Sequence, residues 1–303
     1  MVRNKINDLI YSEPCLLFPR LSLSLYTSNN GCMNKAILLT GGSAGIGKAT
    51  AWCLMKNGYT VYALSRSGCE CQEDTKSGGK IVSIQADVTQ PETLKAAVAQ
   101  IVTEQGGIYG VICNAGNGIA GAVEDTSLAE LEYQFATNYY GVVNTVQACL
   151  PQLRKQGWGK IITVSSMAAV APIPYQTFYS SVKSAILAFT EALSLEVKPF
   201  GIQCACVMPG DVKTNFTNAR KYTQASKLEQ SVYTKNMLKA VQTMEKDEQN
   251  GMSPDAIAKT MLRLLKRKRM PMRNIPGFSY KALSFIIDCV PASFKMWVIG
   301  KLY

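Results

Sequence analysis

The sequence predicts an α/β fold with a doubly wound parallel sheet, and three observations carry this prediction. Short apolar runs rich in β-branched residues alternate with longer amphipathic stretches of helical period. The apolar runs are continuous, as in strands that are covered on both faces. Glycine turns and polar residues follow several runs, at the edge where open α/β sheets bind ligands. With 303 residues and 47% apolar side chains, the chain can bury one large core.

The individual elements follow from the same pattern. Right-handed crossovers are expected between the strands. Ser253-Pro254-Asp255 is typical of the start of a late helix. The expected strands are 36–40, 60–65, 81–86, 109–113, 161–165 and 202–208, and the expected helices are 47–57, 92–105, 127–156 and 176–198.

One domain is expected at 33–277, with an extension at each end. The regular strand and helix pattern begins at Met33, where MNKAILLT leads into the first strand. Residues 1–32 are therefore expected to be a poorly ordered extension; the alternative is that translation starts at Met33. The polar stretch 212–251 interrupts the alternation and is expected to be a substrate lid. Residues 278–303 form an apolar and basic tail.

The composition excludes several kinds of site. The chain has no histidine, and its ten cysteines are scattered, several of them inside apolar runs. The close pairs Cys69/Cys71 and Cys204/Cys206 lack metal-site spacing, so no metal site is expected. Buried free thiols in a reducing compartment are the favoured interpretation, which predicts a cytoplasmic protein.

The positive charge is concentrated near the carboxyl end. Of the net +11, residues 253–303 supply ten basic against two acidic side chains, densest in LLKRKRM. A nucleic-acid motif and interleaved aromatic residues are missing, so we expect a solvated helix end and no nucleic-acid partner. No apolar run reaches the length that spans a membrane.

A glycine-rich turn follows the first expected strand. It reads TGGSAGIGKA from Thr40 to Ala49, with Gly41, Gly45 and Gly47 in a TGxxxGxG spacing. Glycines let the chain turn sharply and let backbone amides approach a pyrophosphate at a helix N-terminus. Between a first strand and a first helix, this turn predicts a nucleotide site.

The end of the second expected strand predicts which nucleotide binds. An acidic residue there would accept hydrogen bonds from an adenosine ribose, but this chain has Ser65 followed by Arg66. A cation favours a 2′-phosphate, and thus NADP, and Ser43 could add a hydroxyl to the same phosphate. The alternative is that Arg66 is only a surface arginine.

Acid–base chemistry without histidine is predicted at Tyr179 and Lys183. They lie four residues apart and therefore share one face of a helix. A phenol titrates near 10, and a neighbouring ammonium and a cationic nicotinamide are expected to lower that pKa. Ser166 lies at the end of the fifth expected strand. A YxxxK pattern alone is a weak signal.

In order and spacing, these motifs resemble the short-chain dehydrogenase/reductase family, which has a Rossmann fold, over about residues 34–277. The resemblance extends to Asn138 in a long helix, and its one small departure is CNAG where NNAG is usual. It implies that Asp87 contacts adenine and that Asn114 lines the cofactor. The expected cofactor contacts are Gly41, Ser43, Gly45, Ile46, Gly47, Ser65, Arg66, Asp87, Val88, Asn114, Ala115, Gly116, Tyr179, Lys183, Pro209, Gly210, Val212 and Thr214.

The resemblance also implies catalytic roles. Tyr179 would protonate the carbonyl oxygen, or take the alcohol proton in reverse. Lys183 would lower the pKa of Tyr179 and hold the nicotinamide ribose, and Ser166 would fix the substrate oxygen. Asn138 would anchor a water that leads protons out past Lys183.

A bulky hydrophobic substrate is expected. Residues 167–174 are largely apolar, and the expected lining is completed by Tyr175, Phe216, Tyr222, Tyr233, Met237 and Met244.

In detail the chain is similar to hydroxysteroid dehydrogenases and acyl-dihydroxyacetone-phosphate reductases. We therefore expect an NADP-dependent oxidoreductase that interconverts a secondary alcohol and a ketone, with a hydroxysteroid or bile acid as the leading substrate class. A lipid ketone such as acyl-dihydroxyacetone phosphate is the near alternative. A non-catalytic nucleotide-binding scaffold is the distant one, and the intact Ser166, Tyr179 and Lys183 argue against it.

The tail and the oligomer allow less specific predictions. Packing of FIIDCVPASFKMWVIGKLY over the pocket or against a partner subunit is favoured. An amphipathic helix lying on a membrane, assisted by KRKR, is the alternative. The resemblance implies a homodimer or homotetramer that pairs through the long helices following Ser127 and Gln176.

Overall fold

The structure, a computed structural model, describes residues 35–227 and 231–302. The expected N-terminal extension, residues 1–32, lies outside the described residues. The rest of the chain, Asn34–Tyr303, forms one compact unit.

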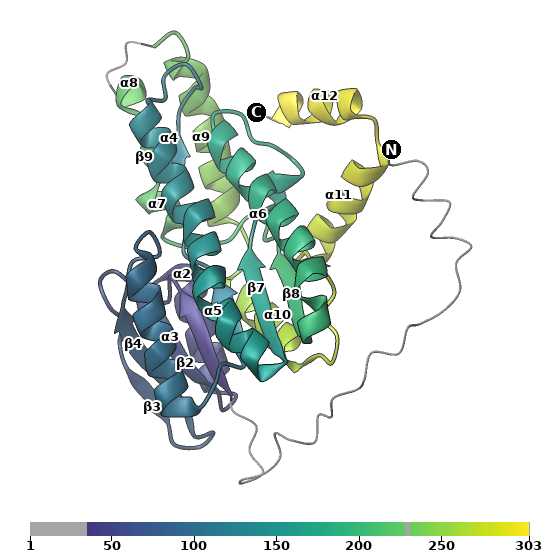
Figure 1. The fold of residues 1–303 in the computed structure, drawn as a ribbon. Coiled ribbons are helices and arrows are strands. Elements are labelled where there is room, and N and C mark those ends of the chain that lie inside the picture. Colours follow the sequence, from purple (N-terminus) through teal and green to yellow (C-terminus); the bar gives the residue numbers. More distant parts are fainter. Residues whose placement is uncertain (1–34, 228–230, 303) are drawn as a thin grey trace, which may run out of the picture. The chain divides into compact units, whose positions relative to one another are not determined.

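An eight-stranded sheet forms the centre of this unit, with the strand order β10-β8-β7-β5-β1-β2-β4-β3 (Figure 1). All pairs are parallel except β3 with β4. The six expected strands are confirmed, and the short edge strands β3 and β10 were not predicted. The strands are β1 (Ala36–Thr40), β2 (Thr60–Ser65), β3 (Gln72–Asp74), β4 (Gly79–Gln85), β5 (Gly110–Cys113), β7 (Gly159–Val164), β8 (Ile202–Val207) and β10 (Arg273–Asn274).

Helices cover both faces of the sheet, as the doubly wound prediction requires. In β1, Ala36 and Leu38 point into one apolar core and Ile37 and Leu39 into the other. The first core is closed by α3 (Pro91–Gln105), α5 (Gly141–Gln156) and α6 (Thr177–Glu196), and the second by α2 (Gly45–Met55) and α10 (Pro254–Lys266). The central strands β1, β2, β5, β7 and β8 therefore bury both of their faces, which explains their continuous apolar runs.

The expected helix 127–156 is not continuous. A π-helical turn, Ala136–Tyr140, separates α4 (Leu128–Phe135) from α5. Inside this turn the side-chain amide of Asn138 donates to the carbonyl oxygen of Gln134 at 2.9 Å, so a side chain occupies a backbone acceptor. Turns of this kind are frequent at functional sites.

The polar segment 212–251 folds at the carboxyl ends of the strands (Figure 1). It contains α7 (Phe216–Ala219), β9 (Lys221–Tyr222), α8 (Gln224–Lys227) and α9 (Thr234–Gln249). Strand β9 pairs in parallel with β6 (Ile119–Ala120), which ties the segment to the loop after β5. Its own small core contains Met237, Val241 and Met244.

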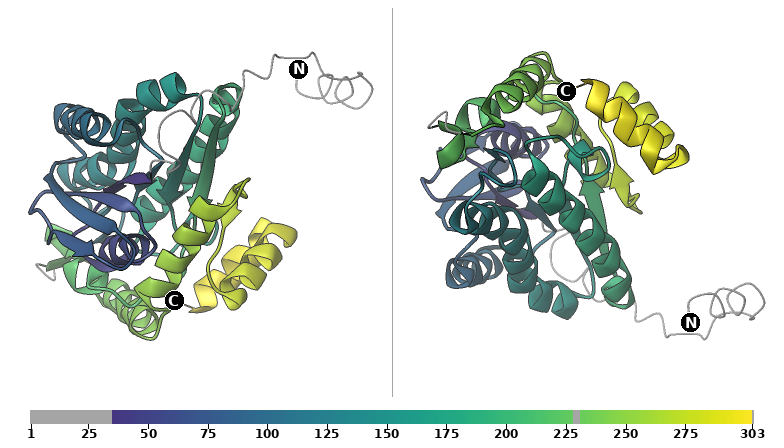
Figure 2. Two further views of the ribbon diagram at one scale, coloured as in Figure 1. Left: turned by 90° about the horizontal axis from the view of Figure 1, so that it is seen from below. Right: turned by 90° about the horizontal axis from the view of Figure 1, so that it is seen from above.

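The tail forms two helices, α11 (Phe278–Cys289) and α12 (Ala292–Leu302), outside the layers that cover the sheet (Figure 2). Short 3₁₀ turns stand at Met167–Ala169 and Lys198–Phe200. Among the described residues, no helix is both long and apolar enough to cross a membrane.

The KRKR run does not lie beside α12. The amine of Lys266 donates to the Asn57 side chain at 2.8 Å, and the carbonyl of Arg267 accepts from Lys160, the second residue of β7. Because β7 begins there, the run lies at the amino-terminal edge of the sheet, opposite the ligand edge.

Candidate active site

A cavity of about 830 Å³ opens at the carboxyl ends of β1, β2, β5, β7 and β8, within the range of small-molecule sites. Nearly all predicted site residues line it, and Gly47 and Asn138 do not. Those that do are Gly41, Ser43, Gly45, Ile46, Ser65, Arg66, Asp87, Val88, Asn114, Ala115, Gly116, Ser166, Tyr179, Lys183, Pro209, Gly210, Val212 and Thr214.

Gly47 supports the glycine turn from behind. A Cβ on Gly47 would stand 1.9 Å from the carbonyl oxygen of Gly41, so only glycine fits. Gly41 and Gly45 have φ of 69° and 52°, which disfavours side chains at both. The amide of Asn114 donates at 3.2 Å to the carbonyls of Thr40 and Gly41. Asn114 therefore holds the turn in place as well as lining the cavity.

This turn fits a phosphate group. Helix α2 starts at Gly45 with no side-chain cap and no acidic residue in its first turn. Its first backbone amides, which have no partner inside the helix, are therefore left to bind an anion. A Cβ on Gly45 would meet only Thr214, at 3.5 Å, so the space before the turn is open. The residues present fit the pyrophosphate of a dinucleotide.

Arg66 and Asp87 line the end of the cavity at which the sequence predicts the adenosine of a cofactor. Ser65 donates from its hydroxyl to the carbonyl of Gly68 at 2.8 Å, which fixes the loop after β2. Arg66 lines the cavity and forms no ion pair with any residue in the described part of the chain. Asp87 accepts from the backbone and hydroxyl of Thr89 at 2.9 and 2.8 Å, so its carboxylate is held in one orientation.

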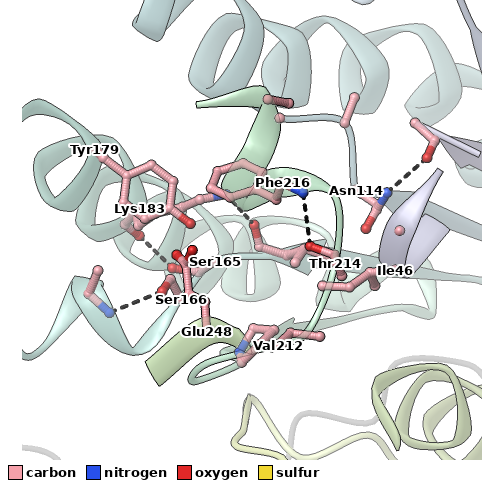
Figure 3. A pocket seen from close by; sticks show the side chains of 18 of the residues that line it. Ile46, Asn114, Ser165, Ser166, Tyr179, Lys183, Val212, Thr214, Phe216 and Glu248 are labelled. Atoms are coloured by element: carbon pink, nitrogen blue, oxygen red, sulfur yellow. Dashed lines mark hydrogen bonds between the residues drawn. The ribbon is translucent and has the colours of Figure 1, made fainter. Parts of the chain in front are cut away.

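Ser166, Tyr179 and Lys183 meet on the other side of the cavity (Figure 3). The Ser166 hydroxyl accepts from the Ala168 backbone at 3.1 Å and lies near enough to the phenol of Tyr179 to lower the pKa of that phenol in part. The ammonium of Lys183 donates to the carbonyl of Val164 at 3.0 Å and stands 5.5 Å from the Tyr179 ring centre. Ser165 also holds this helix, by donating to the carbonyl of Lys183 at 2.7 Å.

Burial decides the protonation of both titratable groups. It raises the pKa of Tyr179 to about 12, although the Ser166 hydrogen bond lowers it in part. It lowers the pKa of Lys183 to about 8. The expectation that the lysine depresses the phenol pKa is therefore wrong for the protein alone, because desolvation penalises the charged form of each group. Tyr179 holds a proton at neutral pH and can donate it.

Asn138 is buried one layer behind the cavity. Its amide nitrogen donates to the side-chain oxygen of Asn117 at 2.7 Å, and its oxygen accepts from the Asn117 backbone at 3.3 Å. A Cβ on Gly116, which does line the cavity, would stand 2.8 Å from that oxygen. Asn138 thus supports the loop after β5 from behind.

The expected lid residues divide into two groups. Phe216 and Met244 line the cavity. Met237, Tyr222 and Tyr175 instead pack together in the core of the segment, and the Tyr233 hydroxyl donates to Glu124 at 2.9 Å. A helical segment must fill its own interior, and the sequence did not distinguish those apolar positions from lining ones.

Acidic residues line the cavity without having been predicted, and the tail lines it as well, in agreement with the favoured packing of the tail over the pocket. Glu248 of α9 accepts from Thr217 at 2.6 Å and from the buried guanidinium of Arg220 at 2.5 Å. Asp211 accepts from the hydroxyl of Tyr280 in α11 at 2.6 Å. The other lining side chains from these parts are Asp247, Leu283, Ile299 and Leu302. Their contribution depends on how α9 and the tail fold back over the sheet, which no motif encodes.

The family model described as short chain dehydrogenase matches residues 35–225. The chain belongs to the short-chain dehydrogenase family. Solved members share the fold, including a short-chain dehydrogenase from Streptomyces avermitilis with a TM-score of 0.71 at 24% identity, which covers 88% of this chain and 97% of that one. A short-chain dehydrogenase/reductase from Burkholderia phymatum, solved in complex with NAD, has a TM-score of 0.70 at 18% identity and covers 83% and 92%.

Curated relatives of this short-chain dehydrogenase include a 3-ketodihydrosphingosine reductase of Bacteroides thetaiotaomicron. It is 40% identical over 241 residues, which cover 80% of this chain and 87% of the relative. Human 17-beta-hydroxysteroid dehydrogenase type 2 is 33% identical over 189 residues, which cover 60% of this chain and 48% of the relative. The chain is thus an oxidoreductase that acts on CH–OH groups, and a nicotinamide cofactor fits the site.

Proposed function

We propose that this short-chain dehydrogenase is an NADPH-dependent reductase of a long-chain lipid ketone of the 3-ketodihydrosphingosine type. The observation that carries the proposal is the 40% identity to a 3-ketodihydrosphingosine reductase over most of both chains. The apolar lining from Met167, Ile173, Phe216 and Met244 suits an alkyl chain beside the reacting carbonyl. Among the predicted substrates, this ranks the lipid ketone above the hydroxysteroid.

The charge of the substrate end supports an amino ketone. Apart from Lys183, the charged residues there are Asp211, Asp247 and Glu248, which are all acidic. Arg220 behind them faces two carboxylates, Glu245 and Glu248, so this cluster remains negative. Acidic groups stabilise a substrate ammonium and repel a phosphate or carboxylate. A 3-ketodihydrosphingosine carries an amino group beside the ketone, whereas acyl-dihydroxyacetone phosphate and bile acids carry anions.

The side chains divide the work of reduction. When bound, the nicotinamide cofactor supplies the hydride to the carbonyl carbon. Ser166 donates a hydrogen bond to the carbonyl oxygen and Tyr179 donates the proton that this oxygen needs. Lys183 holds the nicotinamide ribose and, once the cofactor is present, favours the phenolate that forms. Asn138 orders the path by which a proton from solvent restores Tyr179.

Arg66 supports the choice of NADP over NAD. Its guanidinium stands at the adenosine end of the cavity without a carboxylate partner among the described residues. A free guanidinium there can bind a 2′-phosphate, and Ser43 lines the same end.

A hydroxysteroid ketone is the second candidate. The 33% identity to human 17-beta-hydroxysteroid dehydrogenase type 2 favours it, over less than half of that protein. A neutral steroid is compatible with the apolar lining, whereas the acidic residues disfavour a bile acid.

The remaining parts of the proposal concern the setting of the enzyme. We propose a single catalytic domain at 33–277 whose segment 212–251 acts as the lid. We also propose a homodimer or homotetramer that pairs through the long helices α4–α5 and α6, in the cytoplasm and with a membrane contact through the tail.

A substrate comparison tests the proposed function. The full chain is mixed with NADPH and, separately, with 3-ketodihydrosphingosine, a neutral steroid ketone and acyl-dihydroxyacetone phosphate, and NADPH consumption is followed. The highest kcat/KM is expected for 3-ketodihydrosphingosine. A higher kcat/KM for the steroid ketone would make a hydroxysteroid the substrate class in place of the lipid ketone. If no ketone leads to NADPH consumption, a non-catalytic scaffold is favoured.

A further inference from the structure

The two tail helices expose an apolar face that their packing leaves uncovered. We propose that this face docks on an anionic lipid bilayer and that the substrate passes from the bilayer into the cavity beside it. The inference rests on the proposed lipid substrate. The docking face is defined by the exposed side chains of Phe278, Leu283, Phe285, Ile286, Phe294, Met296, Trp297 and Leu302.

The exposure is concentrated on these two helices. Eight of the fifteen exposed large apolar side chains in the described chain lie here, so exposed apolar side chains are concentrated on the tail rather than spread evenly over the surface. Phe285 is 72% exposed and Trp297 is 61% exposed. In α12, only Ile299 is fully buried, while Lys295 is half-buried and donates to the carbonyl of Val170 at 3.2 Å. Most large apolar side chains of α12 are therefore exposed, while the cation of Lys295 is drawn inward beside the buried Ile299.

The composition of the face matches a membrane interface. Tryptophan and phenylalanine prefer the boundary between headgroups and acyl chains, and Phe294 stacks on Trp297 with ring centres 5.9 Å apart. Exposed Lys281 and Lys301 flank the apolar side chains, while the one acidic residue of the tail, Asp288, stands 3.9 Å from Arg273. The charge left over is positive and complements an anionic lipid surface.

The face also borders the cavity. Leu283, Ile299 and Leu302 line the cavity, and Leu283 and Leu302 belong to the docking face as well. Tyr280 fixes α11 to the site through Asp211 and lies against Gly210, where a Cβ would stand 2.3 Å from the tyrosine ring. An alkyl chain leaving the bilayer at this face would meet the cavity wall without crossing open water. The two helices lie on the surface of the bilayer in this proposal, since neither is long and apolar enough to cross it.

Vesicle binding by the full chain tests the docking face. Wild-type protein is sedimented at low salt with vesicles of equal parts phosphatidylglycerol and phosphatidylcholine, and with phosphatidylcholine alone. Binding is expected to the anionic vesicles. The variant Phe285→Glu/Trp297→Glu is expected to lose at least about tenfold in affinity, because two aromatic side chains no longer bury apolar area and two negative charges face the anionic lipid.

Matched variants and a soluble substrate provide the controls. Leu195→Glu replaces another exposed apolar side chain, at the end of α6, and is expected to bind vesicles as wild type does. Lys281→Glu/Lys301→Glu is expected to bind weakly at low salt. The five substituted residues, from the three variants above, have no role in the proposed reduction. Turnover of a water-soluble short-chain analogue of 3-ketodihydrosphingosine is therefore expected to stay unchanged in every variant.

Several outcomes would overturn the docking proposal. These are wild-type protein that stays in solution with anionic vesicles, a Phe285→Glu/Trp297→Glu variant that binds them as wild type does, or a wild-type dimer in sedimentation analysis that this variant dissociates. The last result would assign the face to a second copy of the chain. Reduction of the soluble analogue without vesicle binding refutes only the docking face, whereas vesicle binding without any ketone reduction refutes the proposed function and leaves the face in place.

Discussion

The ammonium of Lys183 stands 5.5 Å from the centre of the Tyr179 ring and donates to the Val164 carbonyl at 3.0 Å. Lys183 is buried and Tyr179 is half-buried, and desolvation moves their pKa values in opposite directions, to about 12 for Tyr179 and about 8 for Lys183. The pair thus favours a neutral phenol before any ligand binds. A neutral phenol is the proton donor that carbonyl reduction requires.

Replacement of Tyr179 by phenylalanine tests the proton donor. The variant keeps the ring but loses the hydroxyl, so turnover should fall by about 10²–10⁴-fold or more. NADPH binding, measured by fluorescence titration, should stay within about threefold of wild type, because the cavity keeps its shape. Retained turnover would exclude Tyr179 as the donor.

The stability of the protein without cofactor should depend on pH through Lys183. Its folded pKa of about 8 lies below the unfolded value of 10.5, so between these values the unfolded chain binds more protons and stability rises with pH. Lys183→Met should lack this rise, which amounts to about 2–3 kcal/mol. Urea unfolding of both proteins at several pH values below 10 measures the difference. If the free energies of unfolding of wild type and Lys183→Met change in parallel with pH, the lowered pKa of Lys183 is contradicted.

Cofactor choice should depend on Arg66. Arg66→Ala removes the cation at the adenosine end, so the Kd for NADPH should rise about tenfold or more, while the Kd for NADH changes little. Lys48→Ala, at an exposed lysine in the same glycine turn, is the control and should leave the ratio of the two Kd values unchanged. If Arg66→Ala raises the Kd for NADPH and the Kd for NADH by the same factor, Arg66 gives no argument for NADP.

Recognition of the headgroup should depend on Glu248. Glu248→Gln keeps the shape of the side chain, with its oxygen accepting from Arg220 and its amide nitrogen donating to the Thr217 hydroxyl, but removes a negative charge beside the reacting groups. We expect kcat/KM for 3-ketodihydrosphingosine to fall about tenfold, or about 1.4 kcal/mol, while that for a neutral ketone of equal chain length is unchanged. A similar fall for both ketones would indicate a structural role for Glu248.

The sequence predicted the sheet and the glycine turn well, for physical reasons that are local. Buried parallel strands must be apolar throughout, and a turn such as Gly41–Gly47 admits few residues other than glycine. Tyr179 and Lys183 are joined by helical geometry alone. These features need no knowledge of distant parts of the chain.

The substrate end was predicted less well because it depends on tertiary packing. Glu248 and Tyr280 reach the cavity only after α9 and α11 fold back over the sheet, and Met237 and Met244 look alike in sequence although only Met244 lines the cavity. The π-helical turn at Asn138 depends on side-chain hydrogen bonds that no periodicity reveals. The direction of the Tyr179 pKa shift was missed because burial could not be read from the spacing.

Hydride transfer to the proposed substrate is the most direct test of the central claim. The full chain is incubated with 3-ketodihydrosphingosine and NADPH that carries deuterium on the transferred position of the nicotinamide, and the product is analysed by mass spectrometry. We predict a long-chain amino alcohol with one deuterium on the carbinol carbon, formed by wild type and not by Tyr179→Phe. An unlabelled product, or no product under conditions in which a steroid ketone becomes labelled, would contradict the account.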